Sequence, residues 1–119
     1  MKTFNYLEKE DRPWGTFYVI QDESNYKIKR LEINPGHRLS YQYHKKRSET
    51  WIVIEGNPTV NIEGTIKDYN PGDTIIIPVL SKHRIENNYE SIVKILEVQT
   101  GTYFGEDDII RISDDYKRK

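Results

Sequence analysis

The most informative part of the chain lies between two glycines and reads GHRLSYQYHKKRSETWIVIEG, from Gly36 to Gly56. Its apolar and aromatic residues alternate with polar ones, which is typical of half-buried β-strands. We therefore predict strands over residues 39–44 and 49–54, separated only by residues 45–48. Two strands joined by so short a connection should be neighbours in space.

Three polar side chains are expected to meet where these two strands adjoin. Gln42 and His44 are two positions apart, so both side chains project from one face of the first strand. Glu49 opens the second strand, which brings its carboxylate near both of them. An imidazole, a carboxylate and an amide oxygen are all suitable ligands for a divalent metal ion.

A second stretch supplies another histidine. It reads GDTIIIPVLSKHRIEN, from Gly72 to Asn87, and predicts a strand over residues 74–77 that ends at Pro78, with His83 on a distant strand. If His83 joins the first three side chains, the set suits one divalent ion such as Zn, Mn, Fe, Co or Ni. The alternative is that these polar side chains only fill the interior of a barrel.

The rest of the chain continues the pattern of short apolar segments and turn residues. Further strands are predicted over residues 16–20, 26–33, 59–62, 65–69, 83–85 and 91–99. So many short strands with frequent turns indicate an all-β sandwich or barrel. The segment 105–119 begins with acidic and ends with basic residues, an order that suits the dipole of a helical turn. An exposed charged tail is the alternative there, and both interpretations stay open.

Length and composition exclude several classes of protein. A chain of 119 residues suits one domain, and the lack of cysteine excludes disulfide scaffolds and thiolate-bound zinc. The 18 basic and 19 acidic residues nearly cancel, so neither nucleic acid nor a membrane is expected as a partner. The longest apolar run, residues 74–80, is far too short to cross a bilayer, and the N-terminus lacks the apolar core of a signal peptide. We therefore expect a cytoplasmic protein.

The two stretches together resemble the paired motifs of the cupin family. The first motif is matched by Gly36, Gln42, His44, Glu49 and Gly56, and the second by Gly72, Pro78, His83 and Asn87. The resemblance implies a cupin double-stranded β-helix, or jelly-roll, barrel that holds one divalent metal ion. The metal ligands that it implies are Gln42, His44, Glu49 and His83. Cupins usually have histidine where Gln42 stands and glycine where Leu80 stands.

The resemblance narrows to the type II mannose-6-phosphate isomerase domain, which has glutamine at the first ligand position. The matching segments are residues 12–15, 26–31, 35–44, 47–51, 97–101 and 105–111. We predict a single cupin domain over residues 1–119, with a core from about 12 to 104 and a tail over 105–119. In many bacteria this domain follows a GDP-mannose pyrophosphorylase domain. These 119 residues contain none, so a stand-alone protein is expected.

The activity that this resemblance implies is metal-dependent aldose–ketose isomerisation, which interconverts mannose 6-phosphate and fructose 6-phosphate. The reaction needs a Lewis acid for the developing oxyanion, a base at the carbon and cations for the phosphate. One alternative is a non-catalytic cupin that binds a sugar or sugar phosphate as a sensor or accessory protein in polysaccharide metabolism. Another alternative is a cupin oxygenase. Many of these enzymes bind their metal with three histidines, and Gln42 at a ligand position disfavours such a site. Histidine often stands in the family at the positions of Lys46 and Thr50, so the substrate stays open.

Candidate residues for catalysis and substrate binding follow from the face of a strand on which each residue lies and from the resemblance. Arg111 is the first candidate for a catalytic or phosphate-binding cation, because it follows the segment that resembles the family's Glu-Asp-Asp-Ile motif. Arg47 and Lys29 are further candidates for binding the substrate, and Lys29 can face inward only if Arg30 faces outward. Glu97 is a candidate general base, with structural hydrogen bonding as the alternative. We also expect a homodimer, because a small isoleucine-rich barrel has apolar surface to cover.

Overall fold

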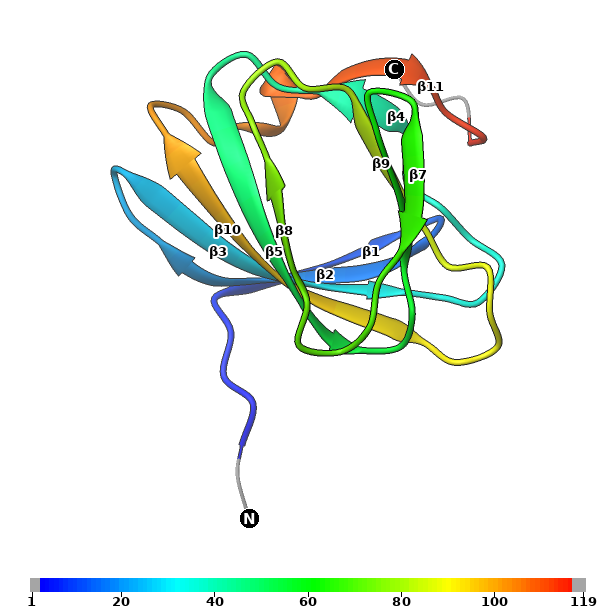
Figure 1. Cartoon of the computed structure of the whole chain (residues 1–119). Helices are drawn as coiled ribbons and strands as arrows, with labels where there is room; N and C mark the ends of the chain where they lie inside the picture. The colour runs from blue at the N-terminus through cyan, green and yellow to red at the C-terminus, as the bar shows by residue number, and fades with distance from the viewer. Residues whose placement is uncertain (1–2, 117–119) are drawn as a thin grey trace.

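The computed structural model describes residues 3–116, which form two antiparallel β-sheets that face each other (Figure 1). The six-stranded sheet has the order β1 (Glu8–Arg12), β2 (Gly15–Asp22), β3 (Tyr26–Ile33), β10 (Val93–Gly101), β5 (Arg47–Glu55) and β8 (Thr74–Ile77). The five-stranded sheet has the order β11 (Ile110–Ser113), β4 (Tyr41–Tyr43), β9 (His83–Glu86), β6 (Thr59–Ile62) and β7 (Thr65–Asp68). The predicted all-β class is confirmed.

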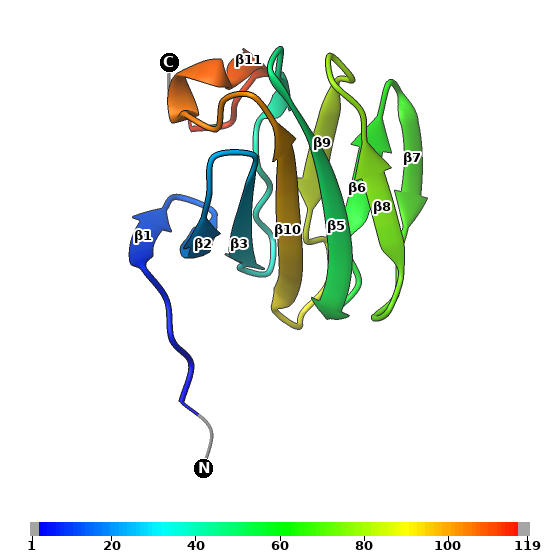
Figure 2. The same ribbon diagram turned by 90° about the vertical axis from the view of Figure 1, so that its left-hand side faces the viewer.

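From β3 onward the chain alternates between the two sheets, with the hairpin β6–β7 staying in one of them. Figure 2 shows the six-stranded sheet from β1 to β5 along the front of the molecule, with β9, β6 and β7 beyond it. From β3 onward, consecutive strands other than β6 and β7 therefore lie on opposite walls of one sandwich. This layout brings β4, β5 and β9 together although residues 41 and 86 are far apart in sequence.

The inner face of the six-stranded sheet changes from apolar to polar along its strands. In β5 and β10 every second residue is buried, as the two-residue period of a strand requires. Toward one end the buried cross-strand pair is Val53 and Ile95, whereas toward the other it is Glu49 and Gln99. The apolar end forms the core, and the polar end forms the candidate site.

The core joins both sheets. Ile33 and Val53 from the six-stranded sheet pack with Val60 and Ile85 from the five-stranded sheet, and each is at most 1% exposed. Burying such aliphatic side chains supplies most of the free energy that favours folding. The core therefore holds the two walls together beneath the polar end of the sandwich.

The predicted strands are present, with differences at their ends. β5 begins at Arg47 rather than at residue 49, and β4 ends at Tyr43, so His44 lies just beyond its strand. β1 is a strand that sequence reasoning missed. It is a mostly exposed edge strand with the sequence EKEDR, so no apolar alternation marks it.

The segment after Gly105 contains a helical turn but is not an exposed tail. Its turn is the 3₁₀ helix η1 (Glu106–Asp108), and the following β11 pairs with β4. The helix-dipole interpretation of this segment also relied on three basic residues at its end. These residues lie outside the described part of the chain: Lys117, Arg118 and Lys119. Within residues 3–116, no helix combines the length and the apolar character that crossing a membrane requires.

Leu80 adopts a conformation that favours glycine. Its φ is +70°, in the left-handed region, and its side chain is 58% exposed. Its backbone N–H donates to the carbonyl of His44 at 2.8 Å, so the turn before β9 is held against the end of β4. Glycine, which cupins usually have at this position, adopts such a backbone conformation without strain, whereas leucine is strained here.

Replacing Leu80 with glycine is expected to stabilise the protein by about 1 kcal/mol. Left-handed backbone costs a residue with a Cβ about 1–3 kcal/mol, and the greater chain entropy of glycine offsets only part of that gain. The exposed neighbour Val79 has no positive φ, so Val79→Gly should lower the stability instead. Urea unfolding of the two variants measures both changes, and a loss of stability in Leu80→Gly would contradict the prediction.

Candidate metal centre and the adjoining pocket

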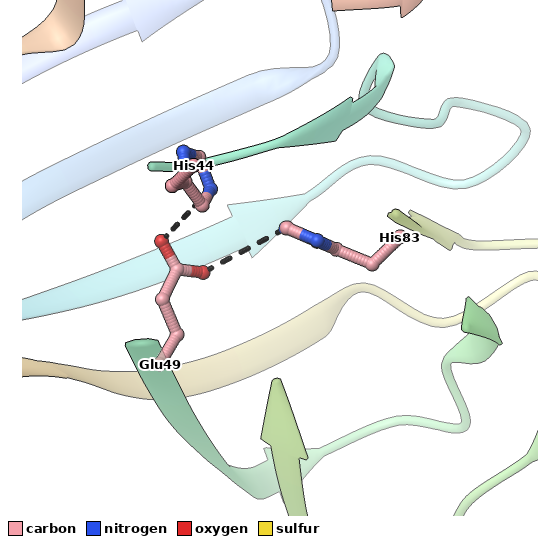
Figure 3. Close-up of side chains that lie close together, drawn as sticks. All are labelled: His44, Glu49 and His83. Atoms are coloured by element: carbon pink, nitrogen blue, oxygen red, sulfur yellow. Dashed lines mark ion pairs between the residues drawn. The ribbon is translucent and has the colours of Figure 1, made fainter. Parts of the chain in front are cut away.

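Three of the four predicted metal ligands meet at the polar end of the sandwich. His44 lies at the end of β4, Glu49 on β5 and His83 at the start of β9 (Figure 3). Each carboxylate oxygen of Glu49 faces one imidazole: Oε2 lies 3.2 Å from Nε2 of His44, and Oε1 lies 4.0 Å from Nε2 of His83. One ligand atom from each residue falls within 4.8 Å of the other two, and all three residues are buried.

Both imidazoles are held so that Nε2 points toward this common point. Nδ1 of His44 is 3.2 Å from the carbonyl oxygen of Asp108, and Nδ1 of His83 is 2.9 Å from that of Ser81. Both Nε2 atoms are buried, and apart from the Glu49 carboxylate neither has a polar partner among the described residues. Buried polar atoms without a partner are rare, and backbone carbonyls on Nδ1 are the usual support of a metal-binding histidine. These residues therefore fit a divalent metal ion.

The electrostatics favour the protonation states that bind a metal. Burial alone would raise the pKa of Glu49, but hydrogen bonding to His44 and the charge of Arg47 hold that pKa well below its usual range. Burial lowers the pKa of His83, although the Glu49 carboxylate acts in the opposite direction. An ionised carboxylate beside neutral imidazole is the form that ligates a metal.

Gln42, the fourth predicted ligand, lies on β4 opposite His83 in the register. Its amide oxygen accepts a hydrogen bond from the Ser40 hydroxyl at 2.6 Å, and Gln42 lines the neighbouring pocket, which the other three residues do not. Its role as a ligand stays a prediction.

A pocket rich in charged side chains adjoins the three residues. Its basic lining residues are Arg12, Lys29, Arg47 and Arg111, and its acidic ones are Glu97 and Glu106. All three cations predicted from the sequence are therefore brought to one place. Apolar side chains complete the wall, among them Trp14 and Phe17.

Lys29 faces this pocket and Arg30 faces away from it. Lys29 is 4% exposed, and its Nζ lies 4.3 Å from the centre of the Phe17 ring and 3.7 Å from a carboxylate oxygen of Glu106. Arg30 forms an ion pair with Glu32 on the outer face of the sheet. Lys29 also lies opposite Glu97 in the register of β3 and β10, and a buried lysine beside carboxylates and a ring face can also contact an anion.

Arg47 connects the three ligands to the pocket. Its Nε donates to Glu49 at 2.9 Å, while its buried Nη1 has no hydrogen-bond partner among residues 3–116. The guanidinium thus braces the carboxylate with one nitrogen and can offer another to a ligand in the pocket.

Glu97 lies between these groups in a network of buried hydrogen bonds. It accepts from Nε1 of Trp51 at 3.0 Å and from Nε2 of Gln99 at 2.8 Å, and the same Trp51 nitrogen lies 3.1 Å from Glu49. Burial, followed by the nearby Glu49 carboxylate, raises the pKa of Glu97 to about 8. A carboxyl group with such a pKa can both take up and release a proton near neutral pH.

Sequence reasoning missed three residues of this region: Arg12, Glu106 and Asp108. Arg12 and Glu106 line the pocket and lie 3.8 Å apart as an ion pair. Arg12 opens the Arg-Pro-Trp-Gly stretch and the two acidic residues belong to the segment after Gly105, so the family resemblance contained a signal. Strand periodicity contained none, because neither segment is an alternating strand.

The comparison with protein families decides the relationship. The model described as "Mannose-6-phosphate isomerase C-terminal" matches residues 2–114. The chain belongs to this family. The narrower of the two resemblances seen in the sequence is thereby confirmed.

Relatives of this family member include longer bacterial proteins. A "Mannose-1-phosphate guanylyltransferase" of Salmonella montevideo is 39% identical over 107 residues, which are 90% of this chain and 23% of the relative. The "Alginate biosynthesis protein AlgA" of Pseudomonas syringae pv. tomato is 38% identical over 117 residues, 98% of this chain and 24% of the relative. The chain thus spans about a quarter of the length of these curated relatives.

Solved structures confirm the fold. A Klebsiella pneumoniae protein described as having a "double-stranded beta-helix domain" superposes with a TM-score of 0.71 over 81% of this chain and 77% of its own. Its sequence identity is 18%, so this likeness concerns the fold alone. The mannose-6-phosphate isomerase C-terminal family member is therefore a cupin barrel, as its two motifs predicted.

Proposed function

We propose that the chain is a metal-dependent isomerase that interconverts mannose 6-phosphate and fructose 6-phosphate. The observation that carries the proposal is a buried His/Glu/His group beside a pocket with four basic side chains and a buried carboxylate. The family description supports the reaction class. A divalent ion held by His44, Glu49 and His83, with Gln42 as a further ligand, would supply a Lewis acid that stabilises negative charge on the sugar oxygens.

We assign proton transfer to Glu97. Isomerisation moves a proton from C2 of the aldose to C1, and a hydroxyl proton from O2 to O1, through an enediol that both sugars share. One carboxylate can hold the proton between these steps, and its pKa should lie near the working pH. Glu97 meets this requirement because burial and Glu49 raise its pKa to about 8. Trp51 and Gln99 fix its orientation through their hydrogen bonds.

We assign phosphate binding to the basic side chains of the pocket. Lys29 and Arg12 both contact Glu106 at 3.7–3.8 Å, and Arg12 also pairs with Glu10, so an incoming phosphate can replace the weak Glu106 contacts with stronger ones. Arg111 on β11 and Nη1 of Arg47 complete a cationic wall. Fixing the phosphate places the sugar carbons, and such positioning accounts for much of the rate of an isomerase.

The test is turnover of fructose 6-phosphate by purified protein. We expect mannose 6-phosphate to form with added Zn, Mn or Co, and the reaction to stop when a chelator is present. Fructose without the phosphate, the matched control substrate, should react at least about 100-fold more slowly because the cations then hold nothing. Binding of mannose 6-phosphate without turnover under any metal would favour the non-catalytic sugar-phosphate-binding cupin. Absence of both binding and turnover would contradict both functions.

A further inference from the structure

The buried residue Asp108 contacts the connection that joins two of the metal ligands. Its carboxylate accepts hydrogen bonds from two consecutive backbone N–H groups, of Lys45 at 3.1 Å and of Lys46 at 3.0 Å. These residues lie between His44 and Glu49, in the short link from β4 to β5. Charged acceptors make the stronger hydrogen bonds, so the two contacts fix this link firmly.

The main chain of Asp108 contacts His44 directly. Its carbonyl oxygen is 3.2 Å from Nδ1 of His44, an arrangement in which Nδ1–H donates and Nε2 keeps its lone pair. Asp108 therefore touches the imidazole through its backbone and the neighbouring link through its side chain. The two contacts act together, because the carboxylate fixes where the carbonyl oxygen lies relative to residues 44–46.

The C-terminal segment carries Asp108 to this position. β11 pairs with β4, with Ile110 opposite Tyr43, so η1 lies across the end of β4 (Figure 1). The neighbouring Asp107 is exposed and instead contacts the hydroxyl of Tyr103. Asp108 is 6% exposed, and its carboxylate rather than that of Asp107 accepts the two hydrogen bonds from the link.

We propose that Asp108 is a positioning residue, which sets the tautomer of His44 and the spacing of His44 from Glu49 for metal binding. The inference rests on the metal site of the proposed function. Outer contacts of this kind change metal affinity by about 10–100-fold when they are removed. The segment 105–113 would thereby belong to the metal site as well as to the pocket.

The experiment compares Asp108→Asn with Asp107→Asn. An asparagine can accept from only one of the two N–H groups and turns its own amide N–H toward the other, so the link loses its fixed position. Calorimetric titration with Zn²⁺ should give a Kd about 10–100-fold weaker for Asp108→Asn, and within about 2-fold of wild type for Asp107→Asn. Circular dichroism checks that both variants are folded.

Nitrogen-15 NMR of the histidine rings gives a readout that a merely structural role would not change. Metal-free wild type should show His44 with the proton on Nδ1, and Asp108→Asn should show a mixture of the two tautomers. An unchanged Kd in folded Asp108→Asn, or a wild-type His44 with its proton on Nε2, would overturn the inference. If Asp108→Asn fails to fold, the wild-type tautomer alone decides. If wild type binds no Zn²⁺, Mn²⁺ or Co²⁺, the proposed metal site and this inference are both wrong. If wild type binds metal and the variant binds it equally well, only this inference is wrong.

Discussion

Replacing His44 and His83 together with alanine is expected to abolish stoichiometric metal binding and to reduce isomerisation to the background rate. The two imidazoles would supply both nitrogen ligands of the proposed site, and the remaining Glu49 is already engaged by Arg47 at 2.9 Å. Removing a residue that only hydrogen-bonds to a metal ligand weakens metal binding by about 10–100-fold. Removing two direct ligands should therefore weaken it by more than that. Mass spectrometry of metal content after dialysis against Zn²⁺, Mn²⁺ or Co²⁺ measures the loss.

His37→Ala is the matched control for this experiment. His37 is the third histidine of the chain, and its Nδ1 lies 2.6 Å from the hydroxyl of Tyr116, away from the metal centre. Its replacement should leave the metal content unchanged. Stoichiometric metal in the folded double variant, or an equal loss in the control, would show that these ligands are wrongly assigned.

The sequence predicted most of the fold because the barrel is built from alternating strands. In β5 the period of two places Arg47, Glu49 and Trp51 on one buried face, as the pattern of residues 47–51 indicates. The edge strand β1 escaped prediction because an exposed, charged strand needs no apolar alternation. β11 escaped for a related reason: its residues are only half-buried, and its place beside β4 is set by tertiary pairing.

The candidate site was predictable to the extent that its residues lie on such strands. His44 and Glu49 are close in sequence, so their proximity followed from one short connection, whereas His83 needed the family resemblance to be placed. Glu106 and Asp108 lie in a segment that the resemblance matches, but neither argument assigned them a role at the site. They reach the site from a 3₁₀ turn whose position depends on the pairing of β11 with β4. Local pattern does not encode that pairing.

The site also shows why one end of the barrel can be polar without unfolding it. Glu49, Glu97, Gln99 and Arg47 would each be costly to bury alone, but they hydrogen-bond to one another and to Trp51. Among residues 3–116, the buried atoms without a hydrogen bond include Nε2 of both histidines, which face Glu49, Nη1 of Arg47, and the side-chain oxygen of Gln99. The network therefore pairs most of its polar groups, and it leaves polar atoms unpaired where a metal ion and an anion would bind.

Glu97→Gln is expected to lower kcat by about 10²–10⁴-fold while metal content and folding are kept. Glutamine has nearly the same shape but cannot take up a proton, so it separates proton transfer from the alternative role of structural hydrogen bonding. The matched control is Glu106→Gln, which changes the other pocket carboxylate, an exposed one. That variant should lose less than about 10-fold, because within residues 3–116 the ion pairs of Glu106 are the long ones with Lys29 and Arg12.

The pH dependence of kcat/KM supplies the second readout for Glu97. A base acts only when ionised, so activity should fall as the pH drops below the pKa of Glu97. That pKa is about 8 without a metal, and a bound divalent cation lowers it because positive charge favours the carboxylate. The acidic limb of the profile should therefore lie below pH 8 in the metal-loaded protein and should disappear in the residual activity of Glu97→Gln. A variant that keeps wild-type turnover, or that keeps the same acidic limb, would assign Glu97 to hydrogen bonding with Trp51 and Gln99 and leave proton transfer to another group.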